Sequence, residues 1–186
     1  MPEKPLQLET QNLILRPWQD SDATSLLGYV RNPLVGRAAG WMPPGEDAKS
    51  EKILKHILTR PITFILALKP TDYPLGSIAL LLSDRSKLVK STTEGEIGFW
   101  LGQEFWHHGY MTEALEAMLK YSFTVQKLTK LWYGYFSDNI KSRSLAAKFG
   151  FHYIYTRHYT YWPALHTIKS ERVAMLTVAE WQTRQK

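Results

Sequence analysis

The sequence contains no cysteine among its 186 residues. Without cysteine there is no disulfide bond, no thiolate metal site and no cysteine nucleophile. The histidines do not follow metal-ligand spacing, so we expect no metal site. A chain that needs no disulfides fits a cytoplasmic location, which we take as the expectation.

Long apolar runs are also missing from the sequence. The longest, at 62–68 and 78–82, are far shorter than the ~20 residues that a membrane-spanning helix requires. Residues 1–4 are not followed by an apolar stretch. We therefore expect neither a membrane span nor a secretory signal.

Acidic residues are fewer than basic ones, which gives a formal net charge of +6. A basic excess favours anionic partners such as a nucleic acid or a phosphate-rich small molecule. The lysines and arginines are scattered rather than gathered in one run. This distribution argues against a nucleic-acid partner and favours the small molecule.

Hydrophobic residues make up 44% of the chain, enough to bury one core. The length predicts a single domain over residues 1–186. The apolar periodicity predicts an α/β (α+β) class with a mostly antiparallel start. The predicted strands are 13–16, 62–69, 75–82, 96–101, 131–136, 152–162 and 172–178, the predicted helices are 20–30, 53–58, 110–125 and 140–149, and the predicted loops include 36–46 and 83–93.

The stretch 94–114 runs from a strand through a short turn directly into a helix. A loop that enters a helix presents unpaired backbone N–H groups and the positive end of the helix dipole. Such a loop suits a pyrophosphate, and Gly109 allows a close approach or a positive φ. On this pattern alone, an ordinary glycine in a strand-to-helix turn is an equal alternative.

A second stretch, 138–151, opens another helix after the fifth predicted strand. Asn139 suits the N-cap position and Ser142 falls in the first turn. These two residues therefore have a purely structural interpretation as well as a functional one.

Taken together, these ordered motifs resemble the GNAT N-acetyltransferase superfamily over nearly the whole chain. The branch they resemble acetylates the N-terminal alanine or serine of ribosomal proteins. The resemblance rests on residues 8–17, 96–101, 106–114 and 148–151, together with Asn139 and Ser142. In the superfamily pattern, Trp106, Gly109 and Met111 occupy the three fixed places, and His107 stands where glycine is frequent.

The resemblance implies an acyl-CoA N-acyltransferase fold, with a central mixed, mostly antiparallel sheet of about seven strands flanked by helices. It implies acetyl-CoA as the acetyl donor, and a primary amine of a protein N-terminus or a small molecule as the acceptor. The residues implied to contact the donor are Phe99, Trp100, Leu101, Trp106, His107, His108, Gly109, Tyr110, Met111, Thr112, Asn139 and Ser142.

With no cysteine available, direct attack of the amine in a ternary complex is the simplest mechanism. Glu96 matches a glutamate position that resembles the base of some superfamily members, and a solvated or salt-bridged strand glutamate is the alternative. Ser142 is the candidate acid for the leaving thiolate. Tyrosine is the commoner acid in the superfamily, so Tyr133, Tyr135 and Tyr153 remain competitors.

Three alternatives stay open at the level of the sequence. A catalytically silent acyl-CoA-binding module has the same fold, a small-molecule amine or antibiotic acetyltransferase has the same motifs, and fold does not fix function. The third alternative is a nucleic-acid-associated protein. A homodimer is compatible with the sequence.

Overall fold

The protein was analysed as a computed structural model that describes residues 6–44 and 48–185. The predicted loop 36–46 therefore ends outside the described residues. Within this part of the chain, eight strands form a mixed sheet in the order β1-β2-β3-β4-β5-β6-β8-β7. All the pairings given for it are antiparallel except that of β5 with β6, which confirms the α+β class.

The chain divides into two compact units. Unit 1 comprises Met1–Ala79 and Phe99–Ala117, and unit 2 comprises Leu80–Gly98 and Met118–Lys186. Three elements pass from one unit into the other, namely β4 (Tyr73–Leu81), β5 (Glu94–Leu101) and α4 (Tyr110–Thr124).

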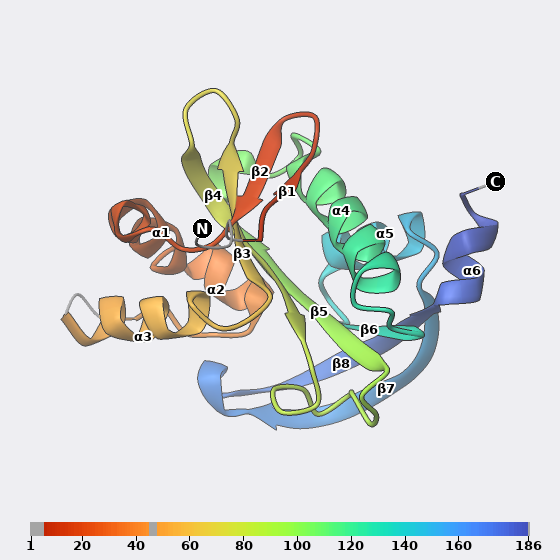
Figure 1. The fold of residues 1–186 in the computed structure, drawn as a ribbon. Helices are drawn as coiled ribbons and strands as arrows, with labels where there is room; N and C mark the ends of the chain where they lie inside the picture. Colours follow the sequence, from red (N-terminus) through yellow and green to blue (C-terminus); the bar gives the residue numbers. More distant parts are fainter. Residues whose placement is uncertain (1–5, 45–47, 186) are drawn as a thin grey trace. The chain divides into compact units, whose positions relative to one another are not determined.

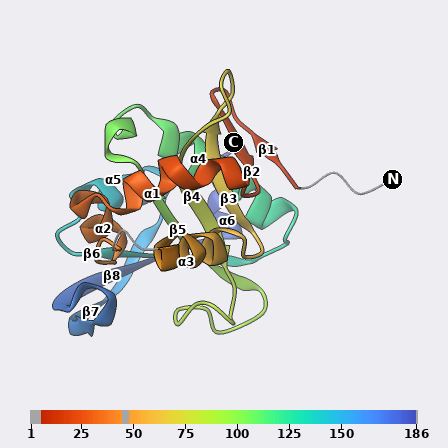
Figure 2. The ribbon, with the colours of Figure 1, turned by 90° about the vertical axis from the view of Figure 1, so that its left-hand side faces the viewer.

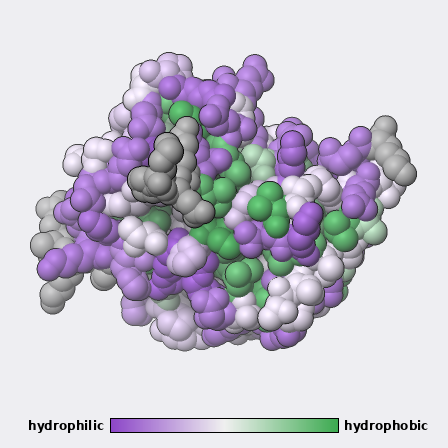
Figure 3. Space-filling model, in the orientation of Figure 1, coloured by the Kyte–Doolittle hydropathy of each residue, from purple (hydrophilic) through white to green (hydrophobic). Residues whose placement is uncertain are grey.

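In unit 1, an antiparallel meander leads from β1 into β4. Its helices α1 and α3 lie on one side of these strands, and the first turns of α4 lie on the other (Figures 1 and 2). Hydrophilic residues cover the outer surface where α1 and α3 lie (Figure 3). The elements that belong wholly to unit 1 are β1 (Leu8–Glu9), β2 (Leu13–Arg16), α1 (Ala23–Val30), α2 (Pro33–Ala39), α3 (Ala48–Leu58) and β3 (Thr63–Leu68).

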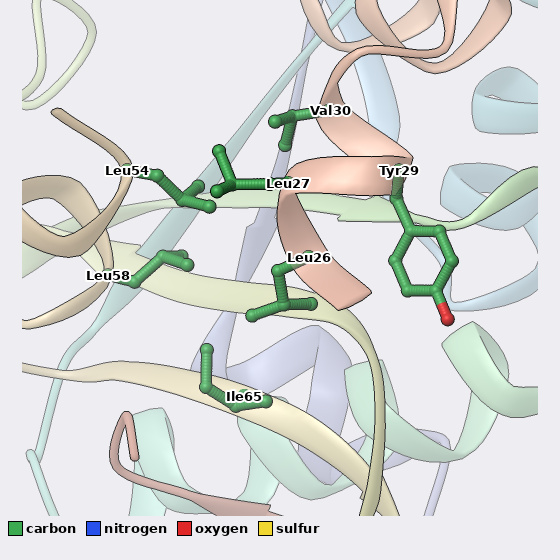
Figure 4. Packing of buried hydrophobic residues seen from close by; sticks show 7 residues of the cluster. All are labelled: Leu26, Leu27, Tyr29, Val30, Leu54, Leu58 and Ile65. Carbon is green, nitrogen blue, oxygen red and sulfur yellow. The ribbon is translucent and has the colours of Figure 1, made fainter. Parts of the chain in front are cut away.

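The core of unit 1 is built where the apolar faces of α1 and α3 meet β3 (Figure 4). Leu26 and Ile65 are fully buried, and Leu58 is 1% exposed. Each such side chain contributes about 1.5–3 kcal/mol by leaving water. Trp100, at the end of β5, packs against this cluster, so the core also fixes the strand that precedes the predicted donor loop.

Unit 2 is organised around β6 (Lys130–Phe136), which pairs in parallel with β5 and antiparallel with β8 (Thr167–Thr177). Strand β7 (His152–Trp162) forms a long hairpin with β8, drawn in blue in Figure 1. Two further helices complete the unit, α5 (Ile140–Lys148) and α6 (Val178–Thr183).

The structure confirms each strand and helix predicted from the sequence, with shifts at their ends. It corrects the predicted loop at 36–46, because residues 36–39 belong to α2. The pair Asn32-Pro33 begins this helix as well as ending α1: the Asn32 side chain accepts a hydrogen bond from the backbone N–H of Leu34, and proline suits the first helical position. Strand β8 starts at Thr167, five residues before the predicted start, because it pairs with the whole of β7.

Candidate functional site

The end of β5 is held tightly against β4 within unit 1. The backbone N–H of Gly102 donates to the carbonyl of Leu75 at 2.8 Å. A Cβ atom added to Gly76 would lie 2.3 Å from the Trp100 carbonyl oxygen, so only glycine allows this approach. Residues Phe99–Leu101, which are predicted to contact the donor, therefore occupy a strand end that is closely held by β4.

Trp106 connects this strand end to the loop that follows. Its indole Nε1–H donates to the carbonyl of Leu101 at 2.9 Å. The side chain is therefore engaged with the protein and ties the loop to the end of β5. The sequence pattern had indicated only that Trp106 occupies one of the three fixed places of the superfamily pattern.

Two residues of the loop have left-handed backbone conformations. His107 has a φ of 69° and Gly109 has a φ of 85°. A histidine in this region costs about 1 kcal/mol relative to glycine, which explains why glycine suits the place that His107 takes. The Nδ1 atom of His108 lies 2.9 Å from the Trp106 carbonyl, and its ring stacks on Tyr110. The carbonyl can only accept, so Nδ1 carries the hydrogen.

The backbone N–H groups of this loop and of the start of α4 lack acceptors. Among the hydrogen bonds of the described residues, none uses the N–H of any residue from 107 to 112, and the first donor is Glu113, which bonds to the Gly109 carbonyl at 3.1 Å. Turns with a positive φ followed by a helix start form concavities that bind anions. A Cβ atom at Gly109 would meet nothing within 4 Å. This arrangement fits a pyrophosphate, and the side chains at 107 and 111 are not needed for it.

The start of α4 is fixed to the β1–β2 turn by Glu113. Its carboxylate accepts hydrogen bonds from Thr10 Oγ1 at 2.7 Å, from Asn12 Nδ2 at 2.6 Å and from the Asn12 N–H at 3.0 Å. Partial burial opposes ionisation, but these bonds outweigh it and lower the pKa of Glu113. Glu113 therefore fixes the start of the helix that presents the N–H groups.

In unit 2, Glu96 has a largely desolvated carboxylate. Burial raises the pKa of Glu96, the negative charge of Glu171 raises it further, and the hydrogen bond from Ser86 and the charge of Arg157 oppose the rise. Ser86 Oγ donates to Glu96 Oε2 at 2.5 Å. No hydrogen bond of the described residues reaches Glu96 Oε1, so this oxygen is available to accept a proton. Among the ion pairs of the described residues none includes Glu96, so the salt-bridged strand glutamate considered as the alternative is not found there. The role of Glu96 as the base stays a prediction.

Ser142 and Tyr133 form a hydroxyl pair in unit 2. Their Oγ and Oη atoms lie 3.0 Å apart, and the Tyr133 hydroxyl also donates to the Ser142 carbonyl. Burial raises the pKa of Tyr133, so its hydroxyl stays protonated and remains a donor. Of the three competing tyrosines, Tyr133 is the one whose hydroxyl contacts Ser142, whereas Tyr153 is exposed and pairs with Thr156. The sequence offered no signal for this pair beyond the presence of both residues.

Glu96 and the hydroxyl pair lie on opposite faces of β6. The Glu96 carboxylate lies above Gly134, since a Cβ atom there would be 3.7 Å from its Oε1 atom. Tyr133, the preceding residue, points to the other face because successive residues of a strand alternate. The base and acid candidates of unit 2 therefore approach β6 from its two sides.

Asn139 occupies the N-cap position of α5, and its Oδ1 atom accepts the backbone N–H of Ser142 at 3.0 Å. We predict that Asn139→Ala lowers the free energy of unfolding by about 1 kcal/mol without any ligand present. Asn139→Asp, which keeps the cap, is the matched control. Urea unfolding of the ligand-free protein measures both variants. Equal stability of Asn139→Ala and the unaltered protein would contradict the capping role and leave donor binding as its function.

Neither a metal centre nor a membrane span emerges from the described residues. Within 6–44 and 48–185, no group of three or more His, Asp or Glu side chains is placed to hold a metal ion. The helices of the same part of the chain are too short or too polar to cross a membrane.

Comparison with known proteins identifies the family to which the chain belongs. The model of the Acetyltransferase (GNAT) domain matches residues 12–152, well over half of the chain. The chain is 28% identical over 153 residues to the "Uncharacterized N-acetyltransferase YoaA" of Bacillus subtilis, covering 77% of this chain and 81% of that protein.

Solved structures show the same fold. A GNAT-family acetyltransferase from Bacillus anthracis superposes with a TM-score of 0.78 at 17% identity, covering 92% of this chain and 98% of that one. The ribosomal-protein-S5-alanine acetyltransferase from Vibrio fischeri superposes with a TM-score of 0.70 at 19% identity, covering 95% and 98%. The chain belongs to the GNAT family of acetyl-CoA-dependent N-acetyltransferases.

Proposed function

We propose that the protein transfers the acetyl group of acetyl-CoA to the α-amino group of a protein N-terminus. The observation that carries the donor assignment is the run of unpaired N–H groups at 107–112, which matches a pyrophosphate. The acceptor assignment is supported by the resemblance of residues 8–17 to the ribosomal-protein branch. Such an acceptor is made in the cytoplasm, where we place the protein.

In the proposed reaction the neutral amine attacks the thioester carbonyl directly. A C–N bond forms, the C–S bond breaks, and the thiolate leaves. Glu96 takes the proton that the amine loses, directly or through one water. Ser142 donates a proton or a hydrogen bond to the departing sulfur. The hydroxyl of Tyr133, which is hydrogen-bonded to Ser142 Oγ, supports this role. The rigid backbone at Trp100–Leu101 polarises the thioester carbonyl.

The remaining assigned residues have positioning roles in this proposal. Phe99 contacts the pantetheine arm through its backbone, and Asn139 holds the start of α5 near it. The residues that surround the pyrophosphate are His107, His108, Gly109, Tyr110, Met111 and Thr112, and Trp106 holds their loop in place. His107 supplies an additional donor to the phosphate oxygens, whereas the Nδ1–H of His108 is engaged by the Trp106 carbonyl.

An acceptor screen tests the proposal. Release of free thiol from acetyl-CoA is measured across peptides that begin with alanine or serine, the same peptides with blocked N-termini, and a panel of small amines and aminoglycosides. We expect turnover on the free peptides only. Turnover on small amines alone would show that the acceptor is a small amine and not a protein N-terminus. Donor binding with no turnover on any amine would indicate a catalytically silent module. Sedimentation of the same preparation tests whether the protein forms a homodimer.

For Ser142 we predict that Ser142→Ala lowers kcat by about tenfold or more, because the donor to the sulfur is lost. The folded state should be nearly unaffected, since Asn139 caps α5 and the serine side chain does not. Thiol-release kinetics and a melting curve, run together, measure both quantities. Equal losses of turnover and donor affinity, with a lower melting temperature, would assign Ser142 to the helix start alone.

A further inference from the structure

Four residues from four strands of unit 2 form a row on one face of the sheet. Glu96 comes from β5, Gly134 from β6, Glu171 from β8 and Arg157 from β7. Arg157 and Glu171 are direct partners in the β7–β8 pairing. The carboxylates of Glu96 and Glu171 both lie over Gly134. We call these four residues the carboxylate row.

Glu171 is buried and anchored by a single partner. It is 6% exposed, and its Oε2 atom accepts from Arg157 Nε at 2.7 Å and from the Nη2 atom of the same side chain. A buried carboxylate is tolerated when it is paired in this way. Both contacts use Oε2, and no hydrogen bond of the described residues reaches Oε1. The Oε1 atom of Glu171 therefore has no hydrogen-bond partner among the described residues and lies over Gly134.

The absence of a side chain at Gly134 leaves room for the carboxylate of Glu171. A Cβ atom at residue 134 would lie 2.5 Å from Glu171 Oε1 and 3.3 Å from its Cδ atom. The first distance is too short for any real contact, so any other residue would displace the Glu171 carboxylate. The backbone of Gly134 has no positive φ, and the close approach of the carboxylates is therefore the reason for glycine here.

The charges that act on Glu96 are limited to this row. From β8 it faces the negative charge of Glu171, and from β7 the positive charge of Arg157. The loop after β4 contributes only the hydroxyl of Ser86. On β5 itself, Glu94 is engaged by Lys130, by Trp132 Nε1 and by the Lys90 N–H.

We propose that Glu171 is a positioning residue for the reaction, which acts by facing Glu96 over Gly134 and making it a stronger proton acceptor. Arg157 anchors Glu171 and offsets part of its charge, so that one net negative charge remains in the row beside the amine of the acceptor. This inference rests on the role of Glu96 in the proposed function. It adds a residue on β8 that touches neither substrate nor donor.

The pH dependence of kcat/KM tests this role, because two variants should shift the acid limb of the profile in opposite directions. The rate rises with pH as Glu96 loses its proton, so the acid limb of the profile follows Glu96. Glu171→Gln removes the like charge and should move this limb to lower pH, on the order of one pH unit. Arg157→Gln removes the opposite charge and should move it to higher pH. A purely structural ion pair would lower the melting temperature in both variants and leave the limb in place, which would overturn the proposal.

A second variant keeps every charge and changes only the geometry. Gly134→Ala should displace the Glu171 carboxylate and move the acid limb in the same direction as Glu171→Gln. Gly28→Ala is the matched control, because a Cβ atom at Gly28 meets nothing within 4 Å and the residue lies on the exposed side of α1. The control should leave the profile unchanged. Comparison of Gly134→Ala with Gly28→Ala tests the role of Glu171 even if Glu171→Gln is too unstable to assay.

The outcomes separate the inference from the proposed function. If no amine is acetylated, or if Glu96→Gln acts at the unaltered rate, the proposed function fails before Glu171 is considered. If Glu96→Gln loses turnover and the limb stays fixed in Glu171→Gln, Arg157→Gln and Gly134→Ala, Glu96 is the base and Glu171 has no part in it. In the Glu96→Gln background, Glu171→Gln should have no further effect on the limb.

Discussion

Replacing Glu96 by glutamine is expected to lower kcat by about two to four decades while the affinity for acetyl-CoA is nearly unchanged. Glutamine keeps the size of the side chain and its hydrogen bond with Ser86, but it cannot take the proton of the amine. Stopped assays of thiol release at pH 7 measure kcat. Thermal shifts with acetyl-CoA measure donor binding in the same preparation.

The pH profile gives this experiment its second readout. Because burial raises the pKa of Glu96, the acid limb of kcat/KM should lie above the ordinary range of a glutamate and disappear in Glu96→Gln. The folded state prefers the protonated form, so Glu96 contributes stability at low pH that is lost as the pH rises through its folded pKa. A rate at neutral pH equal to that of the unaltered protein would remove Glu96 from the mechanism.

Gly109→Glu is expected to abolish acetyl-CoA binding. At about 100 times its dissociation constant, the donor should stabilise the unaltered protein by about 2.7 kcal/mol, which a thermal shift reveals. The new side chain places a negative charge beside the six N–H groups of 107–112, which have no acceptor among the described residues. It also requires a φ of 85° from a residue with a Cβ atom. No shift with acetyl-CoA is therefore expected.

Two controls separate loss of the site from loss of the fold. Gly109→Asn tolerates a positive φ without adding charge, and it should retain most of the thermal shift. The rival view is that His107 and Met111 have closed the site in this chain. It requires that the unaltered protein shows no shift and that the double change His107→Gly with Met111→Ala gains one. That gain would overturn the donor assignment of residues 106–112.

The fold could be predicted from the sequence wherever a local pattern determined the element. The apolar stripe of α4 and the strand 131–136 are examples, and both are confirmed. Helix α2 was missed because Asn32-Pro33 ends one helix and begins the next, and the end was the more familiar signal. The early start of β8 was missed because residues 167–171 are mostly polar and are ordered by pairing with β7.

In the candidate site too, the parts with a local sequence pattern could be predicted, and the contacts between distant parts of the chain could not. The loop at 106–112 was predicted from the family resemblance together with a local signal, a glycine directly before a helix. Glu171 and Arg157 gave no signal, because each lies far along the chain from Glu96 and meets it only across the sheet. The contact of Tyr133 with Ser142 likewise depends on how α5 packs against β6.

The alternation at Tyr133 and Gly134 makes β6 the part of the chain least tolerant of a change in length. A deletion or insertion of one residue before this pair would exchange the two faces of the strand. A phenol ring would then meet the carboxylates of Glu96 and Glu171, and Ser142 would face a hydrogen atom. Both sets of contacts can be kept only if the number of residues along this strand is preserved.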